Sequence, residues 1–273
     1  MVVPEPVADP DDPRLGPFLR LTDGALRRGG DADGPLFIAE SVQVVRRVLA
    51  SGLQVRAVVV TPAAYPRLAT ELDRLGAATP VYLVERPVLA AAAGFDVHRG
   101  VLAAVQRPPA RTVEAVLAGA GSLVAVLEGI NDQENLGVIF RNAAALGVGG
   151  LLLCPRCCDP LYRRTVRVSM GEVLSLPWAR VEPWPAGLGA LRRAGFVLEA
   201  LTPAAEERLA AGPPGERCAV MLGSEADGLS PEALAAADRR VAIPMHRRVD
   251  SLNVAAASAI AFHVHGSAYD PRR

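Results

Sequence analysis

The amino-acid sequence predicts an α/β protein with parallel strands that helices cover on both faces. Three observations support this fold class. Short apolar runs alternate along the chain with helical segments rich in Ala, Leu and Arg. The runs of the C-terminal half are continuously apolar rather than alternating, as is typical of strands buried on both faces. The chain has 273 residues, of which 51% are hydrophobic and 21% charged, and this is ample for a buried core.

The N-terminal half begins with residues 1–17, which are rich in Pro and Asp and are expected to form a disordered tail. Four strands are predicted after it, with helices between them: Leu36–Ala39, Val55–Val60, Val81–Val84 and Val101–Val105. Pro108-Pro109 then interrupts the chain before a short helix at Arg111–Ala118. The predicted division is therefore a tail at 1–17, a smaller domain at 18–108, a linker at 109–120 and a larger domain at 121–273.

The C-terminal half repeats the alternation. The predicted strands are Leu123–Leu127, Gly150–Leu153, Phe196–Leu201, Ala219–Leu222 and Val241–Ile243. The predicted helices are Asn135–Leu146, Ala186–Ala194, Ser230–Ala237 and Ser251–Val264. Because ligands bind beyond the carboxyl ends of parallel strands, the loops after Leu127, Leu222 and Ile243 are the expected site.

The net charge of the chain excludes no class of binding partner. The chain carries 29 Lys and Arg residues against 29 Asp and Glu residues, so no net field favours a nucleic acid, although local patches remain possible. The first residues do not combine a basic start with a long apolar run, and we expect a cytoplasmic protein without a membrane segment.

Cysteine and histidine patterns do not predict a metal centre. Cys154, Cys157 and Cys158 are crowded together, but a structural zinc site needs a second pair of ligands and only Cys218 remains. Reduced thiols after a strand are the expected state. The two histidines near the C-terminus, His263 and His265, are two residues apart and point to different faces of a helix.

The first polar loop is Glu128–Gly137, which leads into a helix that carries Arg141. Asn135 is expected to cap this helix, and acidic residues around it suit the positive end of the helix dipole. Arg141 has apolar or small neighbours, so its side chain is expected to reach solvent, to be paired or to serve a function.

The second loop, Gly223–Ser230, and the third, Ile243–Asn253, also follow apolar strands. Glycine in the second loop permits close approach of a ligand to the main chain, and Glu225 adds a carboxylate. Ser230 is the predicted N-cap of the next helix. Ser251 is the predicted N-cap of the last helix, whose small residues allow another backbone to pass closely.

A nicotinamide or nucleotide enzyme is not predicted. Gly147–Gly150 is rich in glycine, but it follows a helix and opens a strand, which is the reverse of a dinucleotide fingerprint.

Taken together, the three loops resemble the three motifs of the SpoU (TrmH-like) family of RNA ribose methyltransferases, within the SPOUT superfamily. The resemblance covers residues 120–270, and three motifs in register make a stronger signal than each alone. The matching segments are Asn135-Leu136-Gly137 with Arg141, Gly223-Ser224-Glu225 with Gly228, and Ile243-Pro244-Met245 with Ser251-Leu252-Asn253-Val254. Arg163–Gly171 is similar to the family's segment between the first two motifs, and residues 20–107 resemble a domain similar to ribosomal protein L30e.

The resemblance implies a C-terminal domain with a deep trefoil knot, an L30e-like N-terminal domain that holds RNA, S-adenosylmethionine as cofactor, and a homodimer with each active site at the subunit interface. Neither a metal nor a membrane partner is expected. The residues that match the family's cofactor site are Leu222, Gly223, Ser224, Gly228, Ile243, Met245, Ser251 and Leu252. The residues that match its catalytic positions are Arg141, Asn135, Glu225, Ser251 and Asn253.

The implied reaction is methyl transfer to a ribose 2′-hydroxyl of structured RNA. Arg141 is the expected key residue, either as a clamp on the RNA phosphate or as an unusual base polarised by that phosphate. Glu225 and Asn253 are expected to orient Arg141 or the ribose. The chain departs from the family pattern at Gln133, where Pro is common, and at His246–Asp250, where small residues are usual; Arg247 and Arg248 there either contact phosphate or are solvated.

The substrate is expected to be 23S rRNA, because the appended N-terminal domain resembles that of family members acting on ribosomal RNA. A tRNA 2′-O-methyltransferase and a catalytically inactive RNA-binding protein are the alternatives. Basic residues of the N-terminal half either form an RNA face or are a solvated helix surface, the commoner case: Arg27, Arg28, Arg46, Arg47, Arg56 and Arg67.

Overall fold

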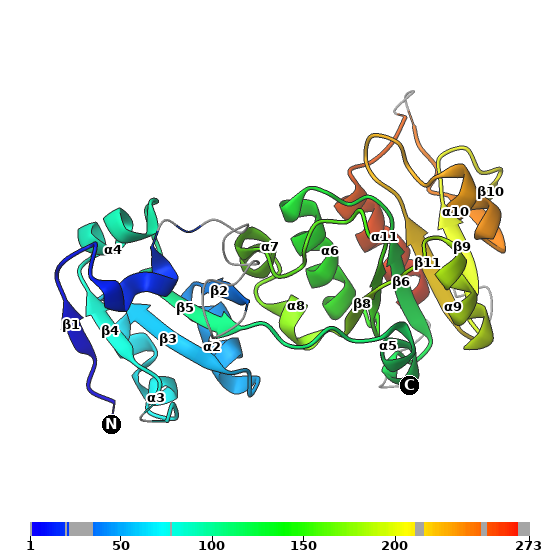
Figure 1. The fold of residues 1–273 in the computed structure, drawn as a ribbon. Coiled ribbons are helices and arrows are strands. Elements are labelled where there is room, and N and C mark those ends of the chain that lie inside the picture. The colour runs from blue at the N-terminus through cyan, green and yellow to red at the C-terminus, as the bar shows by residue number, and fades with distance from the viewer. Residues whose placement is uncertain are drawn as a thin grey trace. The chain divides into compact units, whose positions relative to one another are not determined.

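The computed structural model describes residues 2–19, 21, 35–76, 78–210, 216–246 and 250–266. The chain divides into two compact units, and Figure 1 labels the helices and strands of each. Unit 1 comprises Met1–Pro109 and Leu161–Leu174, and unit 2 comprises Ala110–Pro160 and Ser175–Arg273. Within the described ranges, no helix has both the length and the apolar character that crossing a membrane requires.

Unit 1 is built on a five-stranded mixed sheet in the order β1-β4-β3-β5-β2. The strands are β1 (Glu5–Val7), β2 (Leu36–Glu40), β3 (Val55–Val60), β4 (Val81–Val84) and β5 (Val101–Gln106). β4 runs parallel to β1 and β3, whereas β5 runs antiparallel to β2 and β3. The helical segments are η1 (Pro13–Phe18), α2 (Val42–Ala50), η2 (Tyr65–Arg67), α3 (Ala69–Leu72), α4 (Arg86–Ala93), α7 (Arg163–Val168) and α8 (Glu172–Ser175), the last ending at the unit boundary.

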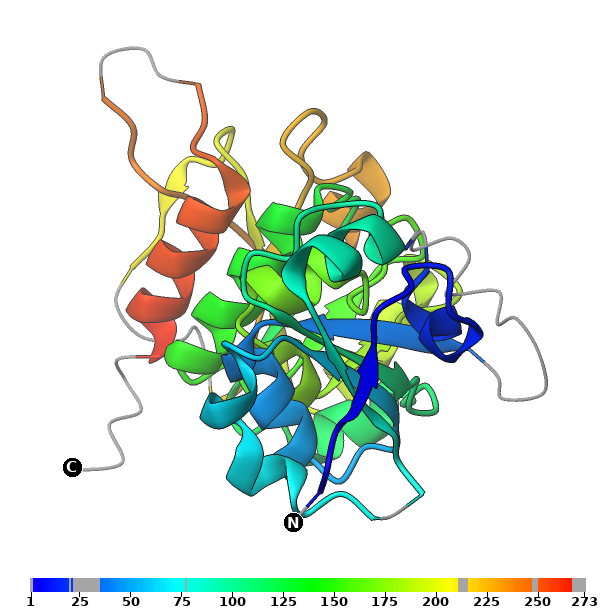
Figure 2. The ribbon, with the colours of Figure 1, turned by 90° about the vertical axis from the view of Figure 1, so that its left-hand side faces the viewer.

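Helices cover both faces of this sheet (Figures 1 and 2). Ala57 and Val59 point into a buried cluster that includes Phe18 of η1 and Leu89 of α4. The alternate residues of β3 point to the opposite face, where α2 contacts β2 and β5. This arrangement matches the predicted α/β class.

The N-terminal segment is a correction to the sequence prediction. Residues 1–17 were expected to be a disordered tail, yet β1 pairs with β4, and η1 buries Leu15 and Phe18 completely. Asp12 caps η1 by accepting a hydrogen bond from the Arg14 N–H at 2.8 Å. The segment is ordered because strand pairing and two large buried side chains offset its polar composition.

The segment Leu161–Leu174 is a second correction, because it packs within unit 1 although the sequence placed it in the domain 121–273. Glu40 at the end of β2 is only 3% exposed, and Arg163 and Arg167 of α7 pair with its two oxygens at 2.6 and 3.3 Å. A buried carboxylate needs such partners. The charges on α7 therefore match a site in unit 1 that no local sequence pattern reveals.

Unit 2 is built on a seven-stranded sheet in the order β10-β12-β9-β11-β6-β7-β8, and every pairing is parallel. The strands are β6 (Leu123–Leu127), β7 (Leu151–Leu153), β8 (Trp178–Arg180), β9 (Val197–Leu201), β10 (Glu207–Arg208), β11 (Cys218–Leu222) and β12 (Arg239–Ala242). The helices are α5 (Val113–Gly119), α6 (Gln133–Ala145), η3 (Ala186–Leu188), α9 (Gly189–Arg193), α10 (Pro231–Ala236) and α11 (Val254–Gly266). The predicted parallel sheet is confirmed.

The C-terminal helix α11 lies against α6 and contacts β11, as Figure 1 shows. Asn142 of α6 donates to the Ala255 carbonyl at 2.9 Å and to the Ser258 hydroxyl at 3.1 Å. At the other end of α11, a Cβ on Gly266 would lie 2.2 Å from the Leu146 carbonyl oxygen. Small residues at these positions let the two helices approach closely.

We expect Asn142→Ala to lower the free energy of unfolding of unit 2 by about 1–3 kcal/mol, because it removes both hydrogen bonds to α11 and leaves the buried Ser258 hydroxyl oxygen without its donor. Both tryptophans, Trp178 and Trp184, belong to unit 2, so urea unfolding followed by tryptophan fluorescence measures this unit.

Asn131→Ala is the matched control, since Asn131 is exposed and makes no hydrogen bond within the described part of the chain. Equal unfolding midpoints for the two variants would contradict the assigned role of Asn142.

Candidate functional site

The three polar loops meet at the carboxyl edge of the unit 2 sheet. They follow β6, β11 and β12, and β6 and β11 are neighbours in the sheet. This is where a parallel α/β sheet binds ligands. The edge therefore brings together residues that lie more than a hundred positions apart in the sequence.

A pocket of about 390 Å³ opens between the second and third loops. Its lining includes all eight residues predicted for the cofactor: Leu222, Gly223, Ser224, Gly228, Ile243, Met245, Ser251 and Leu252. It also includes Leu201, Thr202 and Pro203 at the end of β9, which the sequence analysis missed. The rule that ligands bind beyond strand ends applies to β9 as well and is the signal that would have found them.

The second loop folds back on itself beside the pocket. The Gly228 N–H donates to the Ser224 carbonyl at 2.9 Å, and the Ser224 N–H donates to the Gly228 carbonyl at 3.2 Å. A Cβ on Gly223 would lie 2.0 Å from the Gly228 carbonyl carbon, so only glycine fits there. Gly228 itself has a φ of +69°, in the left-handed region that favours glycine.

One side chain joins all three loops. The Asn253 Nδ2 donates to Asn135 Oδ1 at 3.0 Å and to Glu225 Oε1 at 2.6 Å. The Asn253 Oδ1 accepts from the Ala255 N–H at 2.9 Å, at the first turn of α11. Four of the five predicted catalytic residues thus belong to these loops, and three of them form a hydrogen-bonded triad: Asn135, Glu225 and Asn253.

Two predicted helix caps were wrong. The N-cap of α6 is Asp132, whose side chain accepts from the Asn135 N–H at 2.8 Å, rather than Asn135. Asn253 rather than Ser251 caps α11, which begins at Val254. Because Asp132 satisfies the helix N-terminus, the side chain of Asn135 is available to Asn253. Ser230 caps α10 as predicted, accepting from the Ala233 N–H at 3.2 Å.

Arg141 does not reach the triad of its own chain. It lies on α6 six residues after Asn135, which turns it to another face of the helix. Its side chain is exposed and does not line the 390 Å³ pocket. Within the described ranges, Arg141 has no hydrogen-bond or ion-pair partner. Of the three explanations that the sequence allowed for this arginine, pairing within the described chain is therefore excluded.

A second pocket, of about 450 Å³, lies against the same loop. It shares Ser224 to Leu229 and Val254 with the first pocket, and it also contains Asn135 and the residues that directly follow β6. The triad residues Asn135 and Glu225 thus line this second pocket, and Glu225 lines both.

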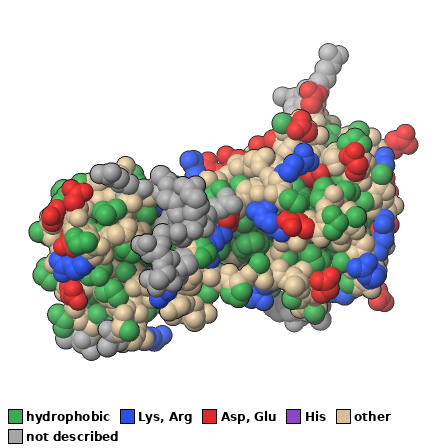
Figure 3. All heavy atoms as spheres, viewed as in Figure 1, with side chains coloured by type: hydrophobic (Ala, Val, Ile, Leu, Met, Phe, Trp, Pro, Cys, Tyr) green, Lys and Arg blue, Asp and Glu red, His purple; other side chains and the backbone are tan. Residues whose placement is uncertain are grey.

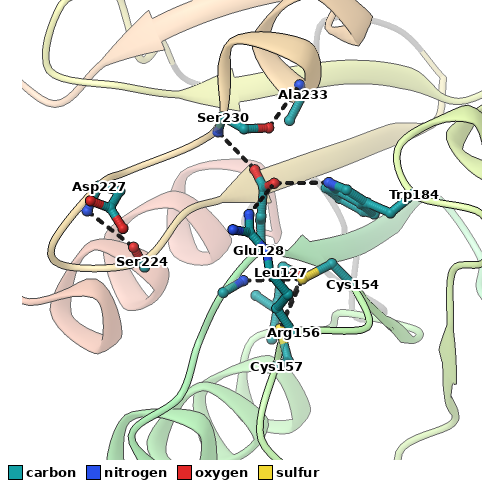
Figure 4. Close-up of polar contacts among 11 residues, drawn as sticks. Leu127, Glu128, Cys154, Arg156, Cys157, Trp184, Ser224, Asp227, Ser230 and Ala233 are labelled. Carbon is teal, nitrogen blue, oxygen red and sulfur yellow. Dashed lines mark hydrogen bonds and ion pairs between the residues drawn. The ribbon is translucent and has the colours of Figure 1, made fainter.

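Glu128 lines this second pocket and holds the surrounding segments by hydrogen bonds. The sequence analysis did not single it out. The residue is 1% exposed, and its Oε2 accepts from the Ser230 N–H at 2.9 Å. Its Oε1 accepts from Trp184 Nε1 at 2.8 Å and from Arg156 at 3.1 Å (Figure 4). A charged residue directly after a wholly apolar strand was the available signal, because a buried carboxylate requires several donors.

Three buried ligand-type atoms outside the loops lie within 4.8 Å of one another, on Glu199, Cys218 and His265. The His265 Nε2 lies 2.6 Å from Glu199 Oε1, and Arg239 lies 3.7 Å from Glu199 Oε2. The carboxylate therefore already has side-chain partners. Burial raises the pKa of the Cys218 thiol to about 12, which disfavours the thiolate that would bind a metal.

Three of the basic residues considered for an RNA face have side-chain partners within unit 1. Arg46 pairs with Glu71, Arg47 pairs with Glu172, and Arg56 Nε donates to Gln106 at 3.3 Å. Arg27, Arg28, Arg247 and Arg248 lie outside the described residues. On the face drawn in Figure 3, basic and acidic side chains are interspersed over unit 2. Surface pairs of this kind are weak, so an RNA face on unit 1 stays a prediction.

Comparison with known proteins identifies the family. The model of the SpoU rRNA Methylase family matches residues 122–263. An uncharacterized tRNA/rRNA methyltransferase of Mycobacterium tuberculosis (strain ATCC 25618 / H37Rv) is 47% identical over 94% of this chain and 90% of its own length. The 23S rRNA (guanosine-2′-O-)-methyltransferase RlmB of Xanthomonas axonopodis pv. citri is 35% identical over 53% of this chain and 59% of its own.

Solved structures share the whole fold. The AdoMet-bound rRNA methyltransferase from Sinorhizobium meliloti has a TM-score of 0.79 at 25% identity and covers 94% of this chain and 95% of its own. An RNA 2′-O ribose methyltransferase has a TM-score of 0.77 at 25% identity over 94% of this chain and 96% of its own. With a family model and a relative that both span the three loops, the chain belongs to the SpoU rRNA methylase family of RNA methyltransferases.

Proposed function

We propose that this protein transfers a methyl group from S-adenosylmethionine to a ribose 2′-hydroxyl of structured RNA, with 23S rRNA as substrate. The observation that carries the proposal is the triad Asn135, Glu225 and Asn253 beside a pocket that all eight expected cofactor residues line. The Xanthomonas relative supports the substrate, since its name gives guanosine 2′-O-methylation of 23S rRNA.

The chemistry of the 390 Å³ pocket fits S-adenosylmethionine. Glu225 and Asp227 add exposed carboxylates to its lining, and these suit a ligand with positive charge on its sulfur and amino group. Apolar side chains suit the adenine ring, and they come from Leu222, Ile243, Met245 and Leu252. The cofactor, when bound, supplies an electrophilic methyl group on sulfur, and the Sinorhizobium neighbour supports this assignment because it is described as AdoMet-bound.

The triad would orient the attacking ribose. A ribose hydroxyl is a weak nucleophile, so transfer needs removal of its proton and alignment of its oxygen with the methyl carbon. Asn253 holds one oxygen of Glu225 and leaves the other able to accept a hydrogen bond from the ribose or from Arg141. Ser251 lines the same pocket two residues before Asn253 and is assigned to the same reaction.

Arg141 is assigned to the site of a second copy of the chain in a homodimer. It is exposed, unpaired among the described residues and outside both pockets of its own copy. The outer side of α11 also carries Ile260, a large hydrophobic residue that is 38% exposed. Burial of this residue against a partner would favour association. Arg141 then acts as a phosphate clamp or as a base polarised by phosphate, and both roles remain assigned to it.

Two further parts of the proposal concern the fold. The packing of α11 against α6 and β11 supports a trefoil knot in which the small-residue helix threads a loop of its own chain.

Unit 1 is proposed as an L30e-like domain that holds RNA. The solved neighbours support a conserved architecture of both units, since they match 94% of the chain.

The substrate is tested with purified protein, labelled S-adenosylmethionine and separated rRNA and tRNA fractions. We expect label in the 23S fraction, at a single ribose 2′-oxygen mapped by resistance of the adjoining phosphodiester to alkali. Label in tRNA would reassign the substrate. Cofactor binding by calorimetry without transfer to any RNA would identify an inactive RNA-binding protein instead.

Arg141→Ala is expected to lower methyl transfer by at least about 100-fold, the usual contribution of a positioned catalytic group. The affinity for S-adenosylmethionine should stay within a few fold, because Arg141 does not line the pocket. Arg193→Ala, at another exposed arginine on α9, is the matched control. A fully active Arg141→Ala protein would remove the catalytic assignment.

Gly223→Ala is expected to abolish detectable cofactor binding in calorimetry, since the new Cβ would displace the loop by contact with Gly228. Gly119→Ala is the control, because a Cβ there meets no atom within 4 Å.

Arg141→Ala and Gly223→Ala together test whether the active site is shared between two copies of the chain. Mixing Arg141→Ala protein with Gly223→Ala protein should restore transfer if Arg141 acts across the interface, since one site of each mixed dimer then has both intact parts. Failure of the mixture to regain activity, with dimers shown to exchange, would place Arg141 in the site of its own chain.

A further inference from the structure

Cys154 and Cys157 follow β7 in the turn Cys154-Pro155-Arg156-Cys157, which the methyltransferase proposal does not use. The Cys157 N–H donates to the Cys154 carbonyl at 3.1 Å, which closes a β-turn and holds the two Cα atoms within about 7 Å. The two sulfur atoms are 3.8 Å apart. A disulfide requires a Cα separation of this size, so a small rotation of the side chains suffices to join the sulfurs.

The turn is held in this geometry by neighbouring elements. Arg180 of β8 donates to the carbonyls of Cys154 at 3.0 Å and of Cys157 at 3.2 Å. The Cys158 N–H donates to the Ile130 carbonyl at 2.9 Å. The backbone therefore presents the two thiols to each other in a fixed arrangement.

Both sulfurs touch the end of β6. The Gly129 N–H donates to Cys154 Sγ at 3.2 Å. Cys157 Sγ lies 3.3 Å from the Leu127 carbonyl oxygen and 3.8 Å from Cys154 Sγ, so its single S–H is shared between these two acceptors. The hydrogen bond with Cys157 lowers the pKa of the Cys154 thiol to about 6, and the same contact raises the pKa of Cys157. Cys154 is therefore the better nucleophile of the two, and Cys157 is placed to resolve. Because Cys154 is 0% and Cys157 5% exposed, an oxidant reaches Cys154 Sγ only when the turn opens, and oxidation is expected to be slow.

The turn is also joined to the loop that walls both pockets. Arg156, between the two cysteines, donates to Glu128 at 3.1 Å, and Glu128 accepts from Trp184 and from the Ser230 N–H (Figure 4). Ser230 ends the loop that begins at Gly223. Movement of the Cys154–Cys157 turn would therefore be transmitted to this loop through Arg156 and Glu128.

We propose that Cys154 and Cys157 are a redox-active dithiol that low-molecular-weight disulfides oxidise reversibly to an intramolecular disulfide. The Cys154 thiolate attacks one sulfur of the oxidant and releases one small thiolate. Cys157 then loses its proton to solvent and attacks Cys154 Sγ in the mixed disulfide, which releases the second small thiolate. Two protein thiols are thereby oxidised, and the small disulfide is reduced to two thiols.

The disulfide alters the support of Glu128. The sulfurs move from 3.8 Å to about 2.05 Å, and the Leu127 carbonyl loses the S–H donor that Cys157 gave it. Arg156 lies inside the closed ring, so its contact with Glu128 changes as well. We therefore expect oxidation to shift Glu128, Trp184 and the Ser230 end of the loop.

The disulfide is tested by incubating the full-length protein with excess oxidised glutathione and digesting it with trypsin. Cleavage after Arg141, Arg156 and Arg163 places Cys154 and Cys157 on separate peptides, 142–156 and 157–163. We expect these peptides joined after oxidation, in wild type and in Cys158→Ser, and separate in Cys154→Ser, in Cys157→Ser and after reduction. Unlinked peptides, a link that Cys158→Ser abolishes, or zinc that copurifies with wild type and not with Cys154→Ser would overturn the proposal.

The coupling is measured by the fluorescence of Trp184 in a Trp178→Phe background. Oxidation is expected to change its emission, and Cys218→Ser should leave that change intact, because Cys218 is buried elsewhere on β11. An unchanged emission in protein with a mapped disulfide would overturn the coupling.

A weaker affinity for S-adenosylmethionine in the oxidised protein, by several fold, is also expected, and this readout alone rests on the proposed function. If the reduced protein binds no cofactor, the proposed function fails while the mapped disulfide and the Trp184 signal still decide the redox site.

Discussion

The functional end of this protein depends on one side chain. Asn253 caps α11 with its oxygen and uses its amide nitrogen to hold Asn135 and Glu225. Each of these contacts is a single hydrogen bond of modest net stability. Their combination constrains three loops at once, because the same planar amide must satisfy all of its partners in one orientation. These hydrogen bonds thereby fix the positions of three segments relative to one another: the start of α11, the second loop and the start of α6.

This arrangement of the loops requires backbone segments to pass very close to each other at two glycines. Gly223 permits the second loop to fold against Gly228, and Gly266 permits α11 to end against the carbonyl of Leu146. Glu128 then fixes the far end of the second loop from the buried side. The loop is thus held at both ends and at its middle, so the pocket beside it is largely formed before any ligand arrives. The turn of Cys154 and Cys157 contacts this support through Arg156.

The sequence predicted the strands that are buried along their length and missed three short strands that are only partly buried or exposed. β3, β4 and β6 have the predicted limits, because continuous apolar runs between helices leave few alternatives. β1, β8 and β10 have two or three residues each and were not predicted. Their stability comes from pairing with a neighbouring strand, and a local pattern contains no information about that neighbour.

The eight residues that the family resemblance indicated for the cofactor all line one pocket, because the resemblance rests on three motifs that the fold brings to the same edge of the sheet. Tertiary structure alone decided that Asp132 caps α6 and so frees Asn135, that Leu161–Leu174 packs in unit 1, and that Glu128 holds the loop from beneath. These outcomes depend on partners far away in the chain, since a cap, a buried ion pair and a hydrogen-bond hub are each chosen by competition among donors and acceptors that only folding brings together.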